Sequence, residues 1–174
     1  DEAYWASLQF TAMYVIVSLI LVNLVAFGLA LLVTAGLRSA NVFRTFFFIP
    51  NLIGGVILGF IWQFVFNRTL TTVGKNFEIP FLESSWLNAP ESAFWALVVV
   101  TVWQMSGYMM IIYITGLMSI ENDVLEAAMI DGASAFRTLW SIRLPLMAQA
   151  FTISIFLTLR NSFMAYDVTV GLTG

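Results

Sequence analysis

The sequence predicts an all-α transmembrane protein, a polytopic bundle of helices. Hydrophobic residues make up 60% of the 174 residues and charged residues only 10%, and the mean hydropathy is +0.92. Soluble domains are roughly 45–50% apolar and about 25% charged. Four stretches are apolar over the about 20 residues that a membrane-spanning helix needs, more than a soluble helical bundle would contain. We expect one transmembrane domain over 1–174, with spans at 11–34, 46–66, 94–118 and 145–166.

The first predicted span, 11–34, has one strongly polar residue in its interior, Asn23. Small residues follow at Ala26, Gly28 and Ala30 and form a small-residue face. Such a face usually packs against another helix. We therefore expect this span to contact the rest of the bundle there.

The second predicted span, 46–66, contains Pro50, which lacks an N–H donor and restricts the residue before it. We expect Pro50 to mark a break near the start of this span. Gly55 and Gly59 form a GxxxG pattern, which permits close helix approach but occurs often by chance in apolar helices. We interpret this pattern as a packing feature only.

The two remaining spans follow a polar loop at 67–91, which contains Lys75 and Pro80. The third span, 94–118, carries a group of polar residues midway along its length. The fourth, 145–166, begins at a proline. We expect the chain to be part of a longer protein.

Four arginines predict the orientation of the bundle. Arg38 and Arg44 lie in the connector after the first span, and Arg137 and Arg143 lie in the loop before the fourth. Two spans separate these loops, so both lie on one side, and the positive-inside rule makes that side the cytoplasm. The loop 67–91 and both ends of the chain then face outward.

The absence of two residue types argues against enzymatic chemistry in this chain. Without Cys no disulfide or thiolate metal site can form, and without His the commonest general base and metal ligand is missing. The net charge is −3, and no basic run offers a nucleic-acid surface. We predict no catalytic residue, no metal site, no cofactor bound by this chain and no nucleic-acid partner.

The segment 121–144 predicts a helix, a turn and a second helix at the membrane surface. Helix-favouring residues, with Asn122 or Asp123 available as N-cap, predict a first short helix ended by Gly132. Ser134 can cap a second helix that continues to about residue 141, and Pro145 suits the first turn of the next span. One face of the first helix is apolar and small enough for another protein to approach: Val124, Leu125, Ala128 and Met129.

The residue pattern of this segment is specific. Glu126-Ala-Ala is followed by three residues, Gly132, nine residues, Ile142, one residue and Leu144-Pro145. This pattern resembles, without a mismatch, the cytoplasmic EAA loop of ABC importer permeases, which docks onto the ATP-hydrolysing subunit. An amphipathic interfacial segment is the alternative, which the spacing disfavours. The resemblance assigns coupling to the ATPase to Glu126, Ala127, Ala128, Met129, Asp131, Gly132, Leu144 and Pro145.

Further stretches resemble the carbohydrate branch of these permeases and are most similar to the maltose-type first permease subunit. They are Val42 to Pro50, Ile61 to Asn67, Gly116 to Ile120, Glu126 to Ser134 and Tyr166 to Gly174.

The resemblance implies a multi-pass permease of a prokaryotic cell (inner) membrane that imports sugars or oligosaccharides by alternating access. It implies a heterodimer with a second permease subunit, an ABC ATPase dimer that binds ATP and Mg, and an extracellular or periplasmic sugar-binding protein. Members of the family usually have six or more spans, so we expect one more span near each end of the longer protein.

Polar residues inside the spans mark where sugar passes, because their burial against lipid costs free energy. Arg160 either lines such a cavity, extends toward the interface or pairs with Asp167. For Ser106, Thr158 and Ser162, a hydrogen bond to the preceding turn or to another helix is an equal alternative. The substrate-pathway candidates are Gln104, Ser106, Gly107 and Tyr108 on the third span and Thr158, Arg160, Asn161, Ser162 and Tyr166 on the fourth.

Three other functions remain to be compared with a sugar importer. A secondary transporter or channel would need coupling carboxylates or an inverted repeat, and the spans contain essentially no acidic residue. A purely structural membrane subunit would bind no ATPase. An importer of amino acids, peptides or phosphate would share the coupling loop and differ only in its substrate residues.

Overall fold

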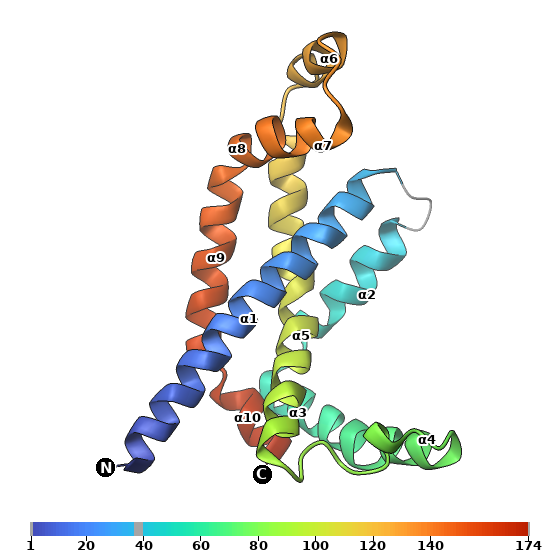
Figure 1. Cartoon of the computed structure of the whole chain (residues 1–174), viewed down its shortest axis with the longest axis vertical. Coiled ribbons are helices and arrows are strands. Elements are labelled where there is room, and N and C mark those ends of the chain that lie inside the picture. The colour runs from blue at the N-terminus through green and yellow to red at the C-terminus, as the bar shows by residue number, and fades with distance from the viewer. Residues whose placement is uncertain (1, 37–39, 174) are drawn as a thin grey trace.

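Four helices form an elongated bundle in the computed structural model, which describes residues 2–36 and 40–173. They are α1 (Glu2–Thr34), α2 (Ala40–Leu52), α5 (Pro90–Met118) and α9 (Ala148–Phe163). The central helix is α5, which α1, α2 and α9 all contact, as Figure 1 shows. All the regular structure of the described residues is helical, which confirms the predicted all-α fold.

Shorter helices complete the chain. Between α2 and α5 lie α3 (Gly55–Phe64), a π-helical segment (Val65–Thr69), α4 (Leu70–Asn76) and a 3-10 turn (Pro80–Leu82). Between α5 and α9 lie α6 (Asn122–Ile130), α7 (Ala135–Thr138), a second π-helical segment (Leu139–Arg143) and α8 (Leu144–Leu146), and α10 (Tyr166–Thr173) follows α9.

The core consists of two apolar clusters stacked along α5. One surrounds Tyr113 and Met109, both fully buried, where α1 and α9 cross α5. The Tyr113 ring packs against Phe27 and Phe151, with ring centroids 5.5 and 4.8 Å away. The other cluster surrounds Leu58 and joins α3 to the opposite end of α5 and to α10.

Three helical stretches are long and apolar enough to cross a membrane: Tyr4–Thr34, Gly55–Asn76 and Pro90–Met118. A fourth arises if 135–146 and α9, which meet at an angle of 69°, count as one broken span. The predicted spans 11–34 and 94–118 lie within α1 and α5.

The second predicted span, 46–66, is not one helix. The chain breaks at Ile53 and Gly54, where Gly54 has an extended backbone (φ −58°, ψ 141°), and α3 then continues in a different direction. Pro50 lies inside α2, buried, in its last turn. The chain therefore does break near Pro50, as predicted, but the break follows the 13-residue helix α2 instead of lying at the start of a longer span.

The fourth predicted span, 145–166, breaks at both ends. Pro145 lies before the bend at Met147, in the helical stretch that begins at α7. It therefore does not start the long helix α9. At the other end α9 stops at Phe163, and the Met164 N–H donates to the Asn161 carbonyl oxygen over 3.0 Å to form the turn into α10.

The ends of the bundle are arranged as the orientation argument requires. The end of α1, the start of α2 and the α6–α7 segment lie at the same end of the bundle, and the loop before α5 lies at the other end (Figure 1). Arg38 lies outside the described residues.

Candidate functional site

Helix α6 lies at the far end of the bundle, beyond the ends of α1, α5 and α9 (Figure 1), and its Leu125 packs against the core cluster around Tyr113. It ends where predicted. Gly132 has φ +75°, the left-handed region that favours glycine, and its N–H donates to the Met129 carbonyl oxygen over 3.0 Å. The Ala133 N–H donates to the Ala128 carbonyl oxygen over 2.9 Å, which completes a Schellman C-terminal motif.

The two N-caps of this segment differ from each other. Ser134 begins α7 as predicted, and its hydroxyl accepts the Arg137 N–H over 3.3 Å. The prediction for α6 was wrong: Glu121 is the N-cap residue, without a side-chain cap, and Asn122 is already helical. Glu121 has an extended backbone (ψ 135°), so α6 begins at least one residue earlier than the Asn122 and Asp123 side chains suggested.

The predicted coupling residues divide into an outer and an inner group. Glu126, Ala127, Met129 and Asp131 are exposed, and Ile130 beside them is 87% exposed. Ala128 is buried, and Leu125 is half-buried and packs against the core cluster of the bundle. The predicted apolar face is therefore divided, because Leu125 and Ala128 are turned inward while Met129 remains exposed.

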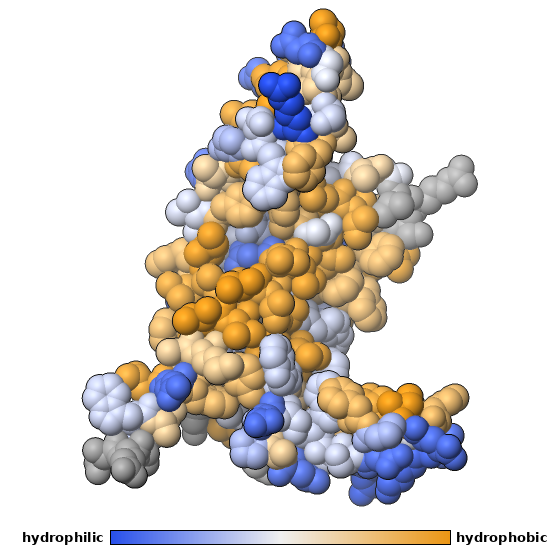
Figure 2. All heavy atoms as spheres, viewed as in Figure 1, coloured by the Kyte–Doolittle hydropathy of each residue, from blue (hydrophilic) through white to orange (hydrophobic). Residues whose placement is uncertain are grey.

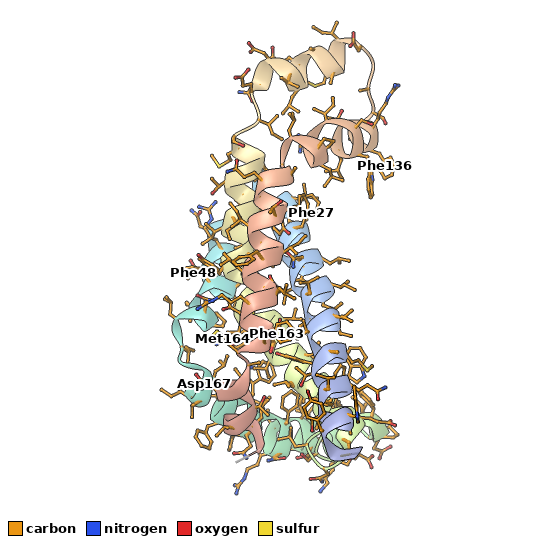
Figure 3. The ribbon with its side chains drawn as sticks, turned by 90° about the vertical axis from the view of Figure 1, so that its left-hand side faces the viewer. Phe27, Phe48, Phe136, Phe163, Met164 and Asp167 are labelled. Atoms are coloured by element: carbon orange, nitrogen blue, oxygen red, sulfur yellow. The ribbon has the colours of Figure 1, made fainter. Side chains whose placement is uncertain are left out.

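A groove of about 500 Å³ runs between α6 and the α7–α8 stretch. Glu126, Met129 and Arg143 line it together with Asn122, Leu125, Ala133, Ala135 and Thr138. Phe136 projects outward from α7 and is 71% exposed (Figure 3). Leu144 is half-buried and Pro145 exposed, both on the stretch that leads to the bend at Met147. The sequence argument missed Phe136 and Ile130, although large apolar residues in a polar loop are a readable signal.

A second, polar cavity of about 290 Å³ lies at the break between α2 and α3 and the break between α9 and α10, and it is open to the outside of the described chain. Gln104, Arg160 and Asn161 of the predicted pathway line it, with Asn51 and Asp167. Gln104 donates from Nε2 to the Ile53 carbonyl oxygen over 3.4 Å. Figure 3 shows Met164 and Asp167 at the α9–α10 junction, beside the α2–α3 break.

Arg160 and Asp167 line the same cavity, but the described structure contains no ion pair between them. The cavity therefore presents a cation, a carboxylate and three side-chain amides. Such a set can bind hydroxyl groups as donor and as acceptor. The sequence argument missed Asn51, although an amide directly after Pro50 in an apolar stretch is a visible signal.

Five of the other predicted pathway residues do not line this cavity. The Ser106 hydroxyl donates to the Val102 carbonyl oxygen within α5, and a Cβ at Gly107 would lie 1.9 Å from the Phe47 carbonyl oxygen of α2. Tyr108 lines a separate groove with Ala150 between α5 and α9. Thr158 and Ser162 are buried, and the Ser162 hydroxyl has no hydrogen-bond partner in the described part of the chain. Tyr166 begins α10, and its side chain lies outside the described residues.

A buried polar network holds α1, α5 and α9 together. Asn23 Oδ1 accepts hydrogen bonds from the Tyr113 and Ser154 hydroxyls, each over 2.7 Å. Asn23 Nδ2 donates to the Leu19 carbonyl oxygen over 2.8 Å and to Thr158 Oγ1 over 3.4 Å. Thr158 thus has the helix-to-helix role that was the alternative to ligand contact.

These features together define a polytopic helical membrane protein with a polar cavity between its helices and an exposed helix at one end. Residues 23–174 match the family of binding-protein-dependent transport system inner membrane components, and the chain belongs to that family. The predicted permease family is thereby confirmed.

The chain is similar to several permease proteins over nearly its whole length. It is 44% identical over 173 residues to the probable starch degradation products transport system permease protein AmyD of Thermoanaerobacterium thermosulfurigenes. That match covers 99% of this chain and 59% of AmyD. It is 30% identical over 174 residues to the multiple sugar-binding transport system permease protein MsmF of Streptococcus mutans. That match covers 100% of this chain and 60% of MsmF.

The trehalose/maltose transport system permease protein MalF of Thermococcus litoralis is also 30% identical over 174 residues, with 98% of this chain and 58% of that protein covered. The chain spans about three-fifths of the length of these relatives.

Proposed function

We propose that this chain is part of the permease subunit of an ATP-driven importer that takes up sugars or oligosaccharides by alternating access. The observation that carries the proposal is α6, an exposed helix with the EAA pattern, at one end of a bundle that has a polar cavity between its helices. The names of the similar proteins, which refer to starch products, multiple sugars and trehalose or maltose, support sugar as the substrate.

The partner at α6 is an ABC ATPase dimer, which binds ATP and Mg. Met129 and Ile130 offer an apolar contact, and Glu126 offers a carboxylate at the rim of the groove for a partner arginine. Helix α6 then lies on the cytoplasmic side of the cell membrane. A second permease subunit completes the pathway, and a sugar-binding protein delivers substrate at the opposite end.

The helices between α6 and the cavity provide a route for coupling. The stretch 135–146 follows the α6 turn and meets α9 at Met147, which is buried in the bundle core. Arg160 and Asn161, at the far end of α9, line the polar cavity. A displacement of α6 by the ATPase therefore changes the position of α9, and with it the shape of the cavity, between two states.

The polar cavity is the proposed sugar pathway. Gln104, Asn51 and Asn161 supply amides, and Arg160 and Asp167 supply charge-assisted hydrogen bonds. Arg160 also suits an anionic solute, and the chain is 30% identical to the sn-glycerol-3-phosphate transport system permease protein UgpA of Agrobacterium fabrum. An importer of a phosphorylated polyol is therefore the second candidate.

ATP-dependent uptake into proteoliposomes that contain the full-length permease, its partner subunits and the binding protein tests the proposal. Labelled maltooligosaccharides, single sugars and glycerol 3-phosphate form the panel. Asn161→Ala and Gln104→Ala should each lower sugar uptake by about tenfold, the effect of one lost hydrogen bond of about 1.4 kcal/mol. Gln149→Ala, at an exposed amide of α9 that lies outside this cavity, is the matched control. Uptake of no sugar, with wild-type assembly intact, would reject the sugar assignment.

A further inference from the structure

We infer that the helical rod Gly55–Asn76 lies in the plane of the membrane interface, at the end of the bundle remote from α6, and binds the lipid headgroup region. The rod consists of α3, the π-helical segment and α4, and its 22 residues are long and apolar enough to cross a membrane. Its orientation is nevertheless different from that of the other long helices. Figure 1 shows it running across the end of the bundle, whereas α1, α5 and α9 run along the bundle.

Close backbone contacts fix the rod in this orientation. A Cβ at Gly59 would lie 2.7 Å from the Gly171 Cα of α10, and a Cβ at Gly171 would lie 2.5 Å from the Val56 carbonyl oxygen. Leu58 and Phe66, on the same side of the rod, are buried in the core. The GxxxG pattern thus has the packing role predicted for it, and it presses the rod against α10.

The face of α3 that points away from the core is apolar and about half exposed in the described part of the chain. Ile57, Phe60, Ile61 and Phe64 recur at helical spacing, and they are 47–61% exposed. Where α4 and the loop that follows it overlap in the view of Figure 2, hydrophobic atoms lie on the side nearer the hydrophobic band of the bundle and hydrophilic atoms on the opposite side. Arg68 and Lys75 are exposed on this part of the rod. An amphipathic helix with this division lies in the interface, with its apolar side toward the acyl chains.

Aromatic residues mark the same level of the molecule as an interface. Tyr4 and Trp5 lie at the first turns of α1, and Trp95 lies near the start of α5, each 49–66% exposed. Both helix ends lie at the end of the bundle where the rod lies (Figure 1). Tyr and Trp concentrate at the headgroup level of membranes, so lipid, rather than another protein, is the occupant of the rod's apolar side.

The absence of cysteine allows a clean test, because one introduced thiol is the only one in this segment. Single cysteines at Ile57, Phe64, Val73 and Lys75 would be labelled with a fluorophore in the full-length permease, with any native cysteines removed, assembled in vesicles. Quenching by lipids that carry a spin label at a shallow or a deep acyl position gives the depth of each site. Cysteines at Ile16, Leu24 and Leu32 of α1 are matched controls, since these residues are 52–66% exposed on a long helix of the bundle.

The inference predicts that Ile57, Phe64 and Val73 lie at the same shallow depth, within about 10 Å of the headgroups. Lys75 should react with a charged aqueous thiol reagent. The α1 controls should change depth progressively, since Ile16 and Leu32 are about 24 Å apart along the helix. A steady change of depth from Ile57 to Val73, about 24 Å over the 16 residues, would show a spanning helix and overturn the inference. Absence of lipid quenching at Phe64 and Val73 in the assembled transporter would overturn it too, because protein would then cover this face.

This test is independent of the proposed function. The depth of each label is measured without transport, so a permease that imports another solute can still confirm the rod's placement. Conversely, a sugar importer whose rod crosses the membrane would keep the proposed function and lose this inference.

Discussion

Replacement of Gly107 by alanine should destabilise the permease, because α2 rests directly on the backbone of α5 at this point. A Cβ at Gly107 would lie 1.9 Å from the Phe47 carbonyl oxygen, 2.3 Å from the Phe47 carbonyl carbon and 2.7 Å from the Phe48 nitrogen. All three atoms are backbone, so no side-chain rotation relieves the contact. Real Cβ contacts essentially never fall under 3.0 Å, so α2 has to move away by about 1 Å or more.

The expected cost is about 1–3 kcal/mol in the free energy of unfolding, the usual range for an overpacked core. Gly28→Ala in α1 is the matched control, because Gly28 is also helical and a Cβ there meets nothing within 4 Å. That variant should be neutral or more stable by about 0.5–1 kcal/mol, the gain from replacing a helical glycine. Unfolding of the purified full-length permease by a denaturing detergent, followed by circular dichroism, measures both changes.

The pair of variants also separates a packing role of Gly107 from a role in binding sugar. If Gly107 serves only packing, Gly107→Ala loses stability and sugar uptake together, and the binding of sugar by the remaining folded protein is unchanged. A Gly107→Ala protein whose free energy of unfolding lies within about 0.5 kcal/mol of wild type, as expected for the Gly28→Ala control, would refute the close approach of α2 to α5.

Three further variants test the packing and the polar network. Asn23→Ala should lower stability by about 1–3 kcal/mol, because it leaves the Tyr113 and Ser154 hydroxyls buried without their acceptor. In the Asn23→Ala background, the added Tyr113→Phe change should cost less stability than it does in wild type. Equal costs in both backgrounds would contradict the network. Gly59→Val should displace α10 and lower stability by about 1–3 kcal/mol, since its side chain would meet the Gly171 backbone. Gly54→Val is the control, because a Cβ at Gly54 meets nothing within 4 Å. An equal loss of stability in the two variants would count against the α3–α10 contact. Ser134→Ala should lower stability by about 1 kcal/mol through the lost N-cap of α7, whereas Ser134→Asp should keep the stability of wild type. A Ser134→Asp protein as unstable as Ser134→Ala in the same unfolding titration would exclude a capping role.

The sequence predicted the parts of this fold that depend on local signals. Composition identified an all-helical membrane protein, and Gly132 and Ser134 predicted the turn and cap of the α6–α7 segment because both act within three or four residues. The N-cap of α6 was missed by one residue, since Asn122 and Glu121 both suit the start of a helix and only the exit path of α5 decides between them.

The parts that were missed depend on tertiary contacts. The apolar pattern of 46–66 is the same whether the segment crosses the membrane or turns at Gly54, and the contact of Gly59 with Gly171 that fixes the turn joins residues more than 100 positions apart. The sequence identified polar residues on the third and fourth spans, but periodicity could not show that Gln104, Arg160 and Asn161 share a cavity while Ser106, Gly107 and Thr158 pack between helices.

The most direct test of the account is sugar-stimulated ATP hydrolysis by the reconstituted full complex, with wild type compared to Gly132→Asp. A Cβ at Gly132 meets nothing within 4 Å, so the substitution creates no steric overlap with this chain and places a charge in the turn that follows α6, at the cost of a side chain at φ +75°. Gly132→Asn is the matched control, because Asn has nearly the same size, tolerates positive φ and carries no charge. The account predicts that Gly132→Asp loses ATPase binding and stimulation while the permease pair still assembles, and that Gly132→Asn retains most of both. Normal stimulation in Gly132→Asp would show that α6 does not couple this protein to an ATPase.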